Sequence, residues 1–125
     1  MNKEKGIIFG ASLGGRRALK SLRKEYDIVG FVDNDRSKHG QDFMGRFVWP
    51  PAEIVNRDVD KIFIASVYAP EIMYQLLREY GILKSKIVVV PAEILSGEDE
   101  VPLGCLVLVA VMLFMIGWGI KVIFF

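Results

Sequence analysis

Glycine residues that follow a short apolar run could bind an anion in this chain. Residues 7–9 (Ile-Ile-Phe) are followed by Gly10, and Gly14 and Gly15 come shortly after it. An uninterrupted apolar run is typical of a strand buried on both faces, and glycine can turn the chain tightly without a Cβ clash. Because backbone amides at the start of a helix attract anions, the sequence predicts an anion site where this strand turns into a helix.

The glycine spacing is close to the fingerprint G-x-G-x-x-G, which places a pyrophosphate against the backbone. Here it reads Gly10-x-Ser12-x-x-Gly15, so serine replaces the middle glycine. That glycine normally allows close approach of the pyrophosphate, whereas the Ser12 hydroxyl can bond a phosphate oxygen. The residues expected to hold the anion are Gly10, Ser12, Gly14 and Gly15. Arg16, in the first helical turn, either contacts the ligand or belongs to a solvated basic face.

An acidic residue follows the second predicted strand. Residues 27–32 form this strand, and Asp33 comes 23 residues after Gly10. The fingerprint expects an acid about 20 residues on, bonded to ribose hydroxyls. Strand, glycine turn, helix, strand and acid occur in the required order, so Asp33 is predicted to bind hydroxyl groups. The alternative is that residues 33–35 are only a polar turn leaving the sheet.

The remaining pattern predicts the sheet that positions these groups. Strands are expected at 7–9, 27–32, 46–49, 61–67 and 86–90, and helices at 14–25, 51–55 and 69–80. This alternation predicts an α/β fold with one parallel sheet, helices on both faces and strand order 3-2-1-4-5. Ligands of such sheets bind at the carboxyl ends of the strands, so Ser66 and Tyr68 are candidates for the second wall of the pocket. Tyr68 could instead be a partly buried aromatic residue at a strand end.

Composition excludes several other functions. The chain has 16 basic and 15 acidic residues, so no strong field points to nucleic acid. One cysteine, Cys105, and one histidine, His39, exclude an internal disulfide and multi-cysteine or multi-histidine metal sites. His39 is interpreted as a solvated loop residue. Tyr80 and Lys84 have the Tyr-x-x-x-Lys spacing of short-chain dehydrogenases, but Gly81 is expected to end the helix between them.

Four segments together resemble one known domain. They are residues 9–16 (Phe-Gly-Ala-Ser-Leu-Gly-Gly-Arg), 28–35 (Ile-Val-Gly-Phe-Val-Asp-Asn-Asp), 38–40 (Lys-His-Gly) and 45–54, which begins Gly-Arg-Phe-Val and ends Pro-Ala-Glu-Ile. They resemble the Rossmann-like nucleotide-sugar-binding domain of bacterial polysaccharide biosynthesis proteins, over about residues 5–91. This domain begins sialic-acid-type and bacillosamine-type sugar acetyltransferases, and it is fused to membrane-bound nucleotide-sugar dehydratases and epimerases.

The resemblance implies a ligand, either NAD or a nucleotide sugar, that contacts Gly10, Ser12, Gly14 and Asp33. The related enzymes continue into a hexapeptide-repeat domain or a second Rossmann domain, and neither is recognised here. The expected function is therefore a membrane-anchored nucleotide or nucleotide-sugar binding module in envelope polysaccharide biosynthesis, with no catalytic residue of its own. The alternatives are an NAD-dependent nucleotide-sugar epimerase or dehydratase, and a split subunit whose partner chain carries catalysis.

The carboxyl-terminal part predicts a membrane anchor. Residues 1–91 are expected to form the nucleotide-binding domain, 92–100 a linker and 101–125 a transmembrane helix. Residues 103–120 carry no charge and would span about 27 Å as a helix, close to the ~30 Å of a hydrocarbon core. The alternative is a buried core or interface helix. The first residues contain no apolar run typical of a signal peptide, so the domain is expected on the cytoplasmic side of the inner membrane.

Overall fold

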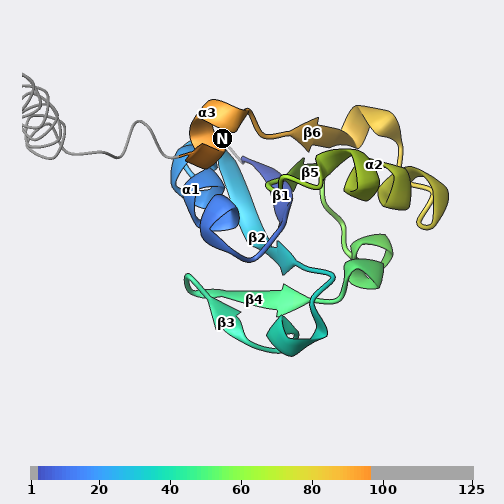
Figure 1. Cartoon of the computed structure of the whole chain (residues 1–125), viewed down its shortest axis with the longest axis horizontal. Helices are drawn as coiled ribbons and strands as arrows, with labels where there is room; N and C mark the ends of the chain where they lie inside the picture. Colours follow the sequence, from blue (N-terminus) through green and yellow to red (C-terminus); the bar gives the residue numbers. More distant parts are fainter. Residues whose placement is uncertain (1–2, 97–125) are drawn as a thin grey trace, which may run out of the picture.

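Six strands form one sheet with the order β3-β4-β2-β1-β5-β6 in a computed structural model of the chain, which describes residues 3–96 (Figure 1). The strands are β1 (Glu4–Phe9), β2 (Tyr26–Val32), β3 (Asp42–Phe43), β4 (Arg46–Trp49), β5 (Lys61–Ile64) and β6 (Ile87–Val89). All neighbouring strands are parallel except β3 and β4. The five parallel strands confirm the predicted order, with β1 and β5 paired at the centre.

The antiparallel edge strand β3 corrects the prediction of a purely parallel sheet. The sequence between residues 36 and 45 indicated only a polar loop. In the structure, Met44 and Gly45 have positive φ angles of 56° and 79°, as in the tight two-residue turns that join hairpin strands. Phe43 therefore returns along β4 and pairs with Arg46.

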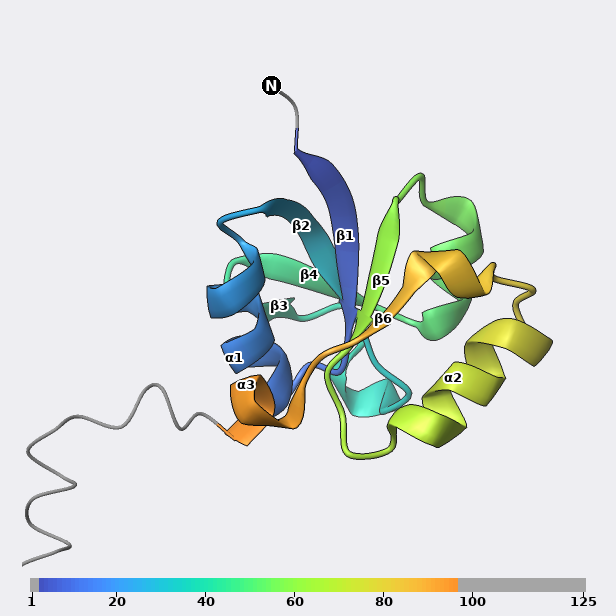
Figure 2. The same ribbon diagram turned by 90° about the horizontal axis from the view of Figure 1, so that it is seen from above.

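Helices cover both faces of the sheet, as predicted. Figure 2 shows α1 (Leu13–Leu22) and α3 (Ala92–Ser96) on one face and α2 (Ala69–Arg78) on the other. Three short 3₁₀ segments are η1 (Arg36–Lys38), η2 (Pro51–Asn56) and η3 (Lys84–Lys86). Helix α1 ends three residues earlier than expected, because the Glu25 amide donates to the Leu22 carbonyl and turns the chain into β2. Helix α3 forms where the sequence predicted the start of a linker.

The core consists of two apolar layers, one on each face of the sheet. Successive strand residues point to opposite faces, so Ile8 and Phe63 pack with Leu19 of α1. Ile7, Phe9, Ile62 and Ile64 pack with Ile72 and Leu76 of α2. Burying one such side chain contributes about 1.5–3 kcal/mol, so this core holds the carboxyl ends of the strands in fixed positions.

Within residues 3–96, no helix has the length and apolar character required to cross a bilayer. The predicted membrane helix over 101–125 and the end of the predicted linker lie outside the residues that the structure describes.

Candidate functional site

The turn after β1 requires glycine at its first position. Gly10 has φ of 125°, and a Cβ there would lie 2.7 Å from the Ala65 carbonyl oxygen. The Gly10 amide donates to the Val32 carbonyl at 2.8 Å, and the Ala65 amide donates to the Phe9 carbonyl at 2.9 Å. These bonds place the turn between the carboxyl ends of β2 and β5, as its predicted role requires.

Two further glycines let α1 pack directly on this turn. A Cβ at Gly15 would overlap the Gly10 carbonyl oxygen, and a Cβ at Gly14 would lie 3.0 Å from the Ala65 carbonyl oxygen. The Arg16 amide donates to the Ser12 carbonyl at 2.9 Å. Because this is the first bond of an α-helical turn, the amides of Leu13, Gly14 and Gly15 precede it and have no acceptor within the helix, as at helix ends that bind anions.

Ser12 occupies the amino-terminal cap of α1 with an exposed side chain. Serine at this position usually caps the helix through its hydroxyl. In the described part of the chain, the Ser12 hydroxyl makes no capping hydrogen bond. The hydroxyl can therefore donate to a ligand oxygen, and its role in ligand binding stays a prediction.

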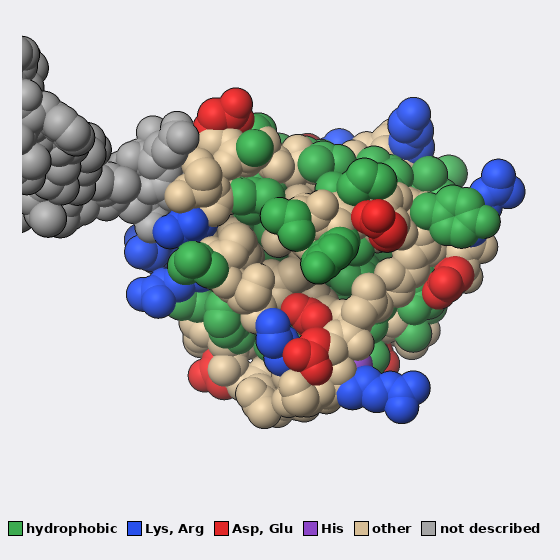
Figure 3. Space-filling view, viewed as in Figure 1, with side chains coloured by type: hydrophobic (Ala, Val, Ile, Leu, Met, Phe, Trp, Pro, Cys, Tyr) green, Lys and Arg blue, Asp and Glu red, His purple; other side chains and the backbone are tan. Residues whose placement is uncertain are grey.

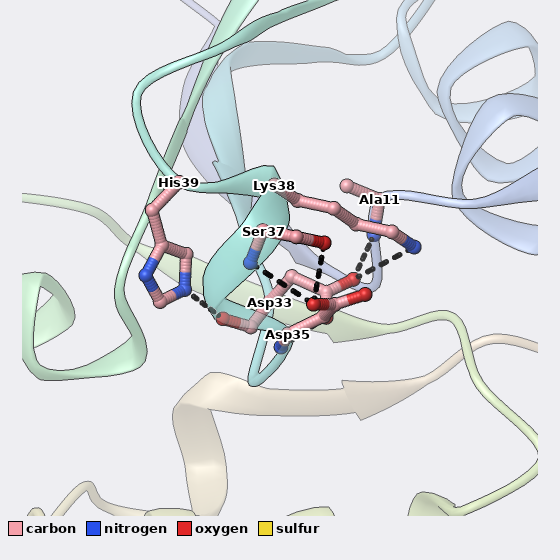
Figure 4. Close-up of polar contacts among 6 residues, drawn as sticks. All are labelled: Ala11, Asp33, Asp35, Ser37, Lys38 and His39. Atoms are coloured by element: carbon pink, nitrogen blue, oxygen red, sulfur yellow. Dashed lines mark hydrogen bonds and ion pairs between the residues drawn. The ribbon is translucent and has the colours of Figure 1, made fainter.

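Asp33 connects the end of β2 to the glycine turn (Figure 4). Its Oδ2 accepts from the Ala11 amide at 2.8 Å, and its Oδ1 accepts from the Asp35 amide at 2.8 Å. The Lys38 ammonium lies 3.7 Å from Oδ2, and the Asp33 side chain is 16% exposed. A carboxylate has about four acceptor positions, so these contacts leave Asp33 able to accept from a ligand hydroxyl.

The loop after Asp33 is ordered by its own polar side chains (Figure 4). Hydrogen bonds from the Ser37 hydroxyl and amide to Asp35 Oδ1, at 2.7 and 3.0 Å, lower the pKa of Asp35 below its ordinary 3.8. His39 Nε2 donates to the Asp33 carbonyl oxygen, and the ring is half-buried. The interpretation of His39 as a solvated loop residue was therefore wrong, since its ring holds the loop against the end of β2.

A pocket of about 520 Å³ opens at the carboxyl ends of the central strands. Four of the predicted site residues line it, namely Gly10, Ser12, Asp33 and Ser66. Gly14 lines a smaller neighbouring pocket, and Gly15 is buried beneath the turn. Arg16 is exposed on α1 and lines neither of these two pockets.

Helix α2 supplies pocket residues that the sequence interpretation missed. Glu71, Ile72 and Gln75 line the pocket, and the side chains of Asn34 and Gln75 exchange two hydrogen bonds of 2.8 and 3.0 Å. The spacing of these α2 residues by three and four positions places them on one helix face and could have indicated this wall. Tyr68 also lines the pocket and is 66% exposed, so the partly buried alternative does not hold.

The acidic pocket lining and the amino end of α1 carry opposite charges, so they favour different parts of a ligand. Among residues 3–96, the pocket lining contains the carboxylates of Asp33, Asp35 and Glu71 and no lysine or arginine. Carboxylates accept hydrogen bonds from hydroxyl groups and repel phosphates. A phosphorylated ligand would therefore place its sugar hydroxyls against the acids and its phosphates against the amino end of α1.

The Tyr-x-x-x-Lys spacing does not form a catalytic pair. Helix α2 ends at Arg78, and Gly81 has φ of 63°. Tyr80 is half-buried against the core layer on the α2 face, whereas Lys84 is exposed in η3. In addition, no group of three or more histidine, cysteine or acidic side chains within residues 3–96 could hold a metal ion.

The chain belongs to the C2185-like family, because the family model of the C2185-like N-terminal domain matches residues 2–88. No curated protein matches the chain.

The solved structures that share the fold include a dehydrogenase and a repressor. UDP-D-quinovosamine 4-dehydrogenase from Vibrio fischeri is 20% identical with a TM-score of 0.60, over 77% of this chain and 86% of that chain. RSP, a Rex-family repressor, is 13% identical in its complex with β-NADH, with a TM-score of 0.53 over 97% of this chain and 65% of that chain. In its complex with β-NAD⁺ and operator DNA, the TM-score is 0.55 and the chain spans 61% of the repressor. At these identities the likeness establishes a Rossmann-like fold.

Proposed function

We propose that residues 1–91 form a binding module for a nucleotide or nucleotide sugar. The observation that carries this proposal is the meeting of Gly10, Ser12 and Asp33 in one pocket at the carboxyl edge of the sheet, beside the amino end of α1. Open α/β sheets bind their ligands at this edge, where the strand order reverses. The fold neighbours support the ligand class, since one is named as a UDP-sugar dehydrogenase and the other was solved with NADH and NAD⁺.

The ligand phosphates bind the amides of Gly14 and Gly15 and the hydroxyl of Ser12. The partial positive charge at the amino end of α1 stabilises this placement. Arg16 contributes to attraction of the anion from its exposed position. Asp33 accepts from a ribose or sugar hydroxyl through its remaining acceptor positions, while Ser66 forms the opposite wall.

The module does not catalyse a reaction alone. The separation of Tyr80 and Lys84 removes the one dehydrogenase-like pair that the sequence offered. A partner enzyme chain would supply catalysis in a split system. An NAD-dependent epimerase or dehydratase remains the alternative, and activity that depends on Lys84 would favour it. We propose no nucleic-acid partner, because 16 basic residues are balanced by 15 acidic ones.

We propose further that residues 101–125 anchor the module in the inner membrane, with the domain in the cytoplasm, and that it serves envelope polysaccharide biosynthesis. The absence of charge over residues 103–120 supports the anchor. The full chain should fractionate with membranes, whereas a chain ending at residue 98 should be soluble. A full chain that stays soluble and monomeric without detergent would disprove the anchor.

Calorimetry against NAD, UDP and UDP-sugars tests the binding proposal. We expect at least one of them to bind, with an affinity that Asp33→Ala lowers by roughly 5- to 150-fold, equivalent to ~1–3 kcal/mol. Lys84→Ala is the matched control and should bind as the unaltered chain does. The proposal fails if none of these ligands binds, or if binding is indifferent to Asp33→Ala.

A further inference from the structure

A second, smaller pocket adjoins the nucleotide pocket. It has a volume of about 250 Å³, and both pockets are lined by Ser12, Ser66 and Tyr68. These three residues therefore form the boundary between the two pockets. The remaining wall comes from the other side of the turn and includes Gly14 and Leu95.

Helix α3 builds the far wall of this smaller pocket. Arg17 Nη1 donates to the Leu95 carbonyl oxygen at 2.8 Å, which holds α3 against α1. A Cβ at Gly14 would lie 3.0 Å from the Ala65 carbonyl oxygen and 3.5 Å from the Leu95 side chain. The bare backbone of Gly14 thus keeps open a space that even one methyl group would narrow.

The two pockets are unequal in a way that distinguishes ligand classes. The smaller volume of about 250 Å³ is close to half of the larger volume of about 520 Å³. A dinucleotide has two nucleosides of similar size, whereas a nucleotide sugar has one nucleoside and one single ring. Both parts are joined through a diphosphate, which would pass over Ser12 at the boundary.

We propose that the smaller pocket binds the sugar ring of a nucleoside diphosphate sugar, while the larger pocket holds its nucleoside. This inference rests on the proposed function and specifies the ligand within it. The amides of Leu13 and Gly14, which line the smaller pocket beside the boundary residue Ser12, bind the diphosphate.

The chemistry of the smaller pocket suits a sugar ring. Val67 and Tyr68 are 86% and 66% exposed and can cover the apolar CH face of a pyranose. Figure 3 shows hydrophobic side chains gathered over α2 and β6 and beside α3. Ser66 Oγ accepts from the Tyr68 amide at 3.1 Å and still has its own O–H to donate to a ring hydroxyl. Arg17 also lines this pocket and adds a positive charge there, which suits an anionic ligand.

Filling the smaller pocket tests this inference in the full-length chain, purified in detergent. Leu95→Trp adds bulk to its wall, and Leu83→Trp is the matched control because Leu83 is 66% exposed outside both pockets. Calorimetry would compare UDP with UDP-N-acetylglucosamine, ADP with ADP-glucose, and NAD. We expect Leu95→Trp to lower the affinity for the sugar-bearing ligand at least tenfold and the affinity for the matching diphosphate less than twofold. Leu83→Trp should change neither affinity.

A second, smaller substitution keeps the inference testable if the Leu95→Trp chain does not fold. Gly14→Ala adds one methyl group and should weaken the sugar-bearing ligand more than the diphosphate. Equal weakening of both ligands in both variants, or no weakening of the sugar-bearing one, overturns the inference and leaves nucleotide binding intact. NAD that binds more tightly than any nucleotide sugar and is lost in Leu95→Trp also overturns it, since a second nucleoside would then fill the space. Binding of no ligand by the unaltered chain overturns the proposed function as well.

Discussion

At the scale of single residues, Asp33 has both a structural and a ligand-binding role. Its carboxylate accepts from the amides of Ala11 and Asp35, so it joins the glycine turn to the end of β2 before any ligand arrives. A bound hydroxyl would therefore meet an acid that is already oriented. Orientation before binding reduces the entropy lost when a ligand is held.

Replacing Asp33 should affect stability and binding together. Asp33→Ala leaves the Ala11 amide without its acceptor, and we expect the free energy of unfolding to fall by about 1–3 kcal/mol. Asp33→Asn keeps one acceptor oxygen and should lose less stability but most of the ligand affinity. Urea unfolding and calorimetry on the same variants measure the two effects. An Asp33→Ala chain with the same urea midpoint of unfolding as the unaltered chain would contradict the structural role of Asp33.

Gly10 is restricted by its backbone conformation and by space. Gly10→Val would require a β-branched residue at φ of 125° with its Cβ 2.7 Å from the Ala65 carbonyl oxygen. We expect a loss of at least about 1–3 kcal/mol of stability. Gly40→Asn is the control, because Gly40 also has a positive φ but no neighbouring atoms within 4 Å of its added Cβ. Similar thermal midpoints for the two variants would show that the turn tolerates a side chain.

Asp35 should show the effect of Ser37 in its titration. Hydrogen bonds from Ser37 lower the pKa of Asp35 in the folded chain, so they add stability above the unfolded pKa. That stability is lost as pH falls through the lowered folded pKa. Ser37→Ala should raise the pKa of Asp35 towards its ordinary value, as measured by NMR of the carboxyl carbon. An unchanged pKa would mean that another group stabilises the carboxylate.

The sequence predicted that Gly10 and Asp33 lie at the same edge of the sheet better than it explained their contacts. The spacing of Gly10 and Asp33 predicted their places, since a strand–turn–helix–strand unit has few possible geometries. The bond from the Ala11 amide to Asp33 depends on the backbone angles of the turn, which spacing does not specify. His39 was misinterpreted for the same reason, because its half-burial follows from how residues 36–45 fold back on β4.

At the scale of elements, α3 completes both the core and the candidate site. Ile94 and Leu95 are half-buried and pack against the layer that contains Ala18 and Leu19. The sequence of residues 92–100 indicated a polar linker, because five helical residues are too few to show a periodic pattern. Contact with α1, including the Arg17 bond to the Leu95 carbonyl, makes this short helix stable.

A chain that lacks α3 should be less stable. We expect the free energy of unfolding of a chain ending at residue 91 to be about 1–3 kcal/mol lower than that of a chain ending at residue 96, because two partly buried aliphatic side chains are lost. Urea unfolding followed by circular dichroism measures the difference. Equal stability of the two chains would show that α3 only rests on the domain surface.

At the scale of the whole molecule, the strand order explains where the site lies. Strand β1 pairs with β2 on one side and β5 on the other, so the connections leave β1 and β5 towards opposite faces of the sheet. This divergence opens the pocket between the glycine turn and α2. The alternation of apolar strands and amphipathic helices was enough to predict this arrangement. The pocket wall formed by α2 was missed because it depends on the path that the chain takes from the end of β5 into α2, and the sequence pattern does not specify that path.

The NMR spectrum of an isotopically labelled chain ending at residue 96 tests the account's central claim most directly. Addition of a nucleoside diphosphate sugar should shift the amides of Ala11, Gly14 and Gly15 most strongly, followed by those around Asp33 and Ser66. The amide resonances of residues at the opposite end of the sheet, around Lys5 and Asp27, should keep their chemical shifts. Shifts concentrated at that opposite end, or no shifts with UDP-sugars, ADP-glucose or NAD, would contradict nucleotide binding at the glycine turn.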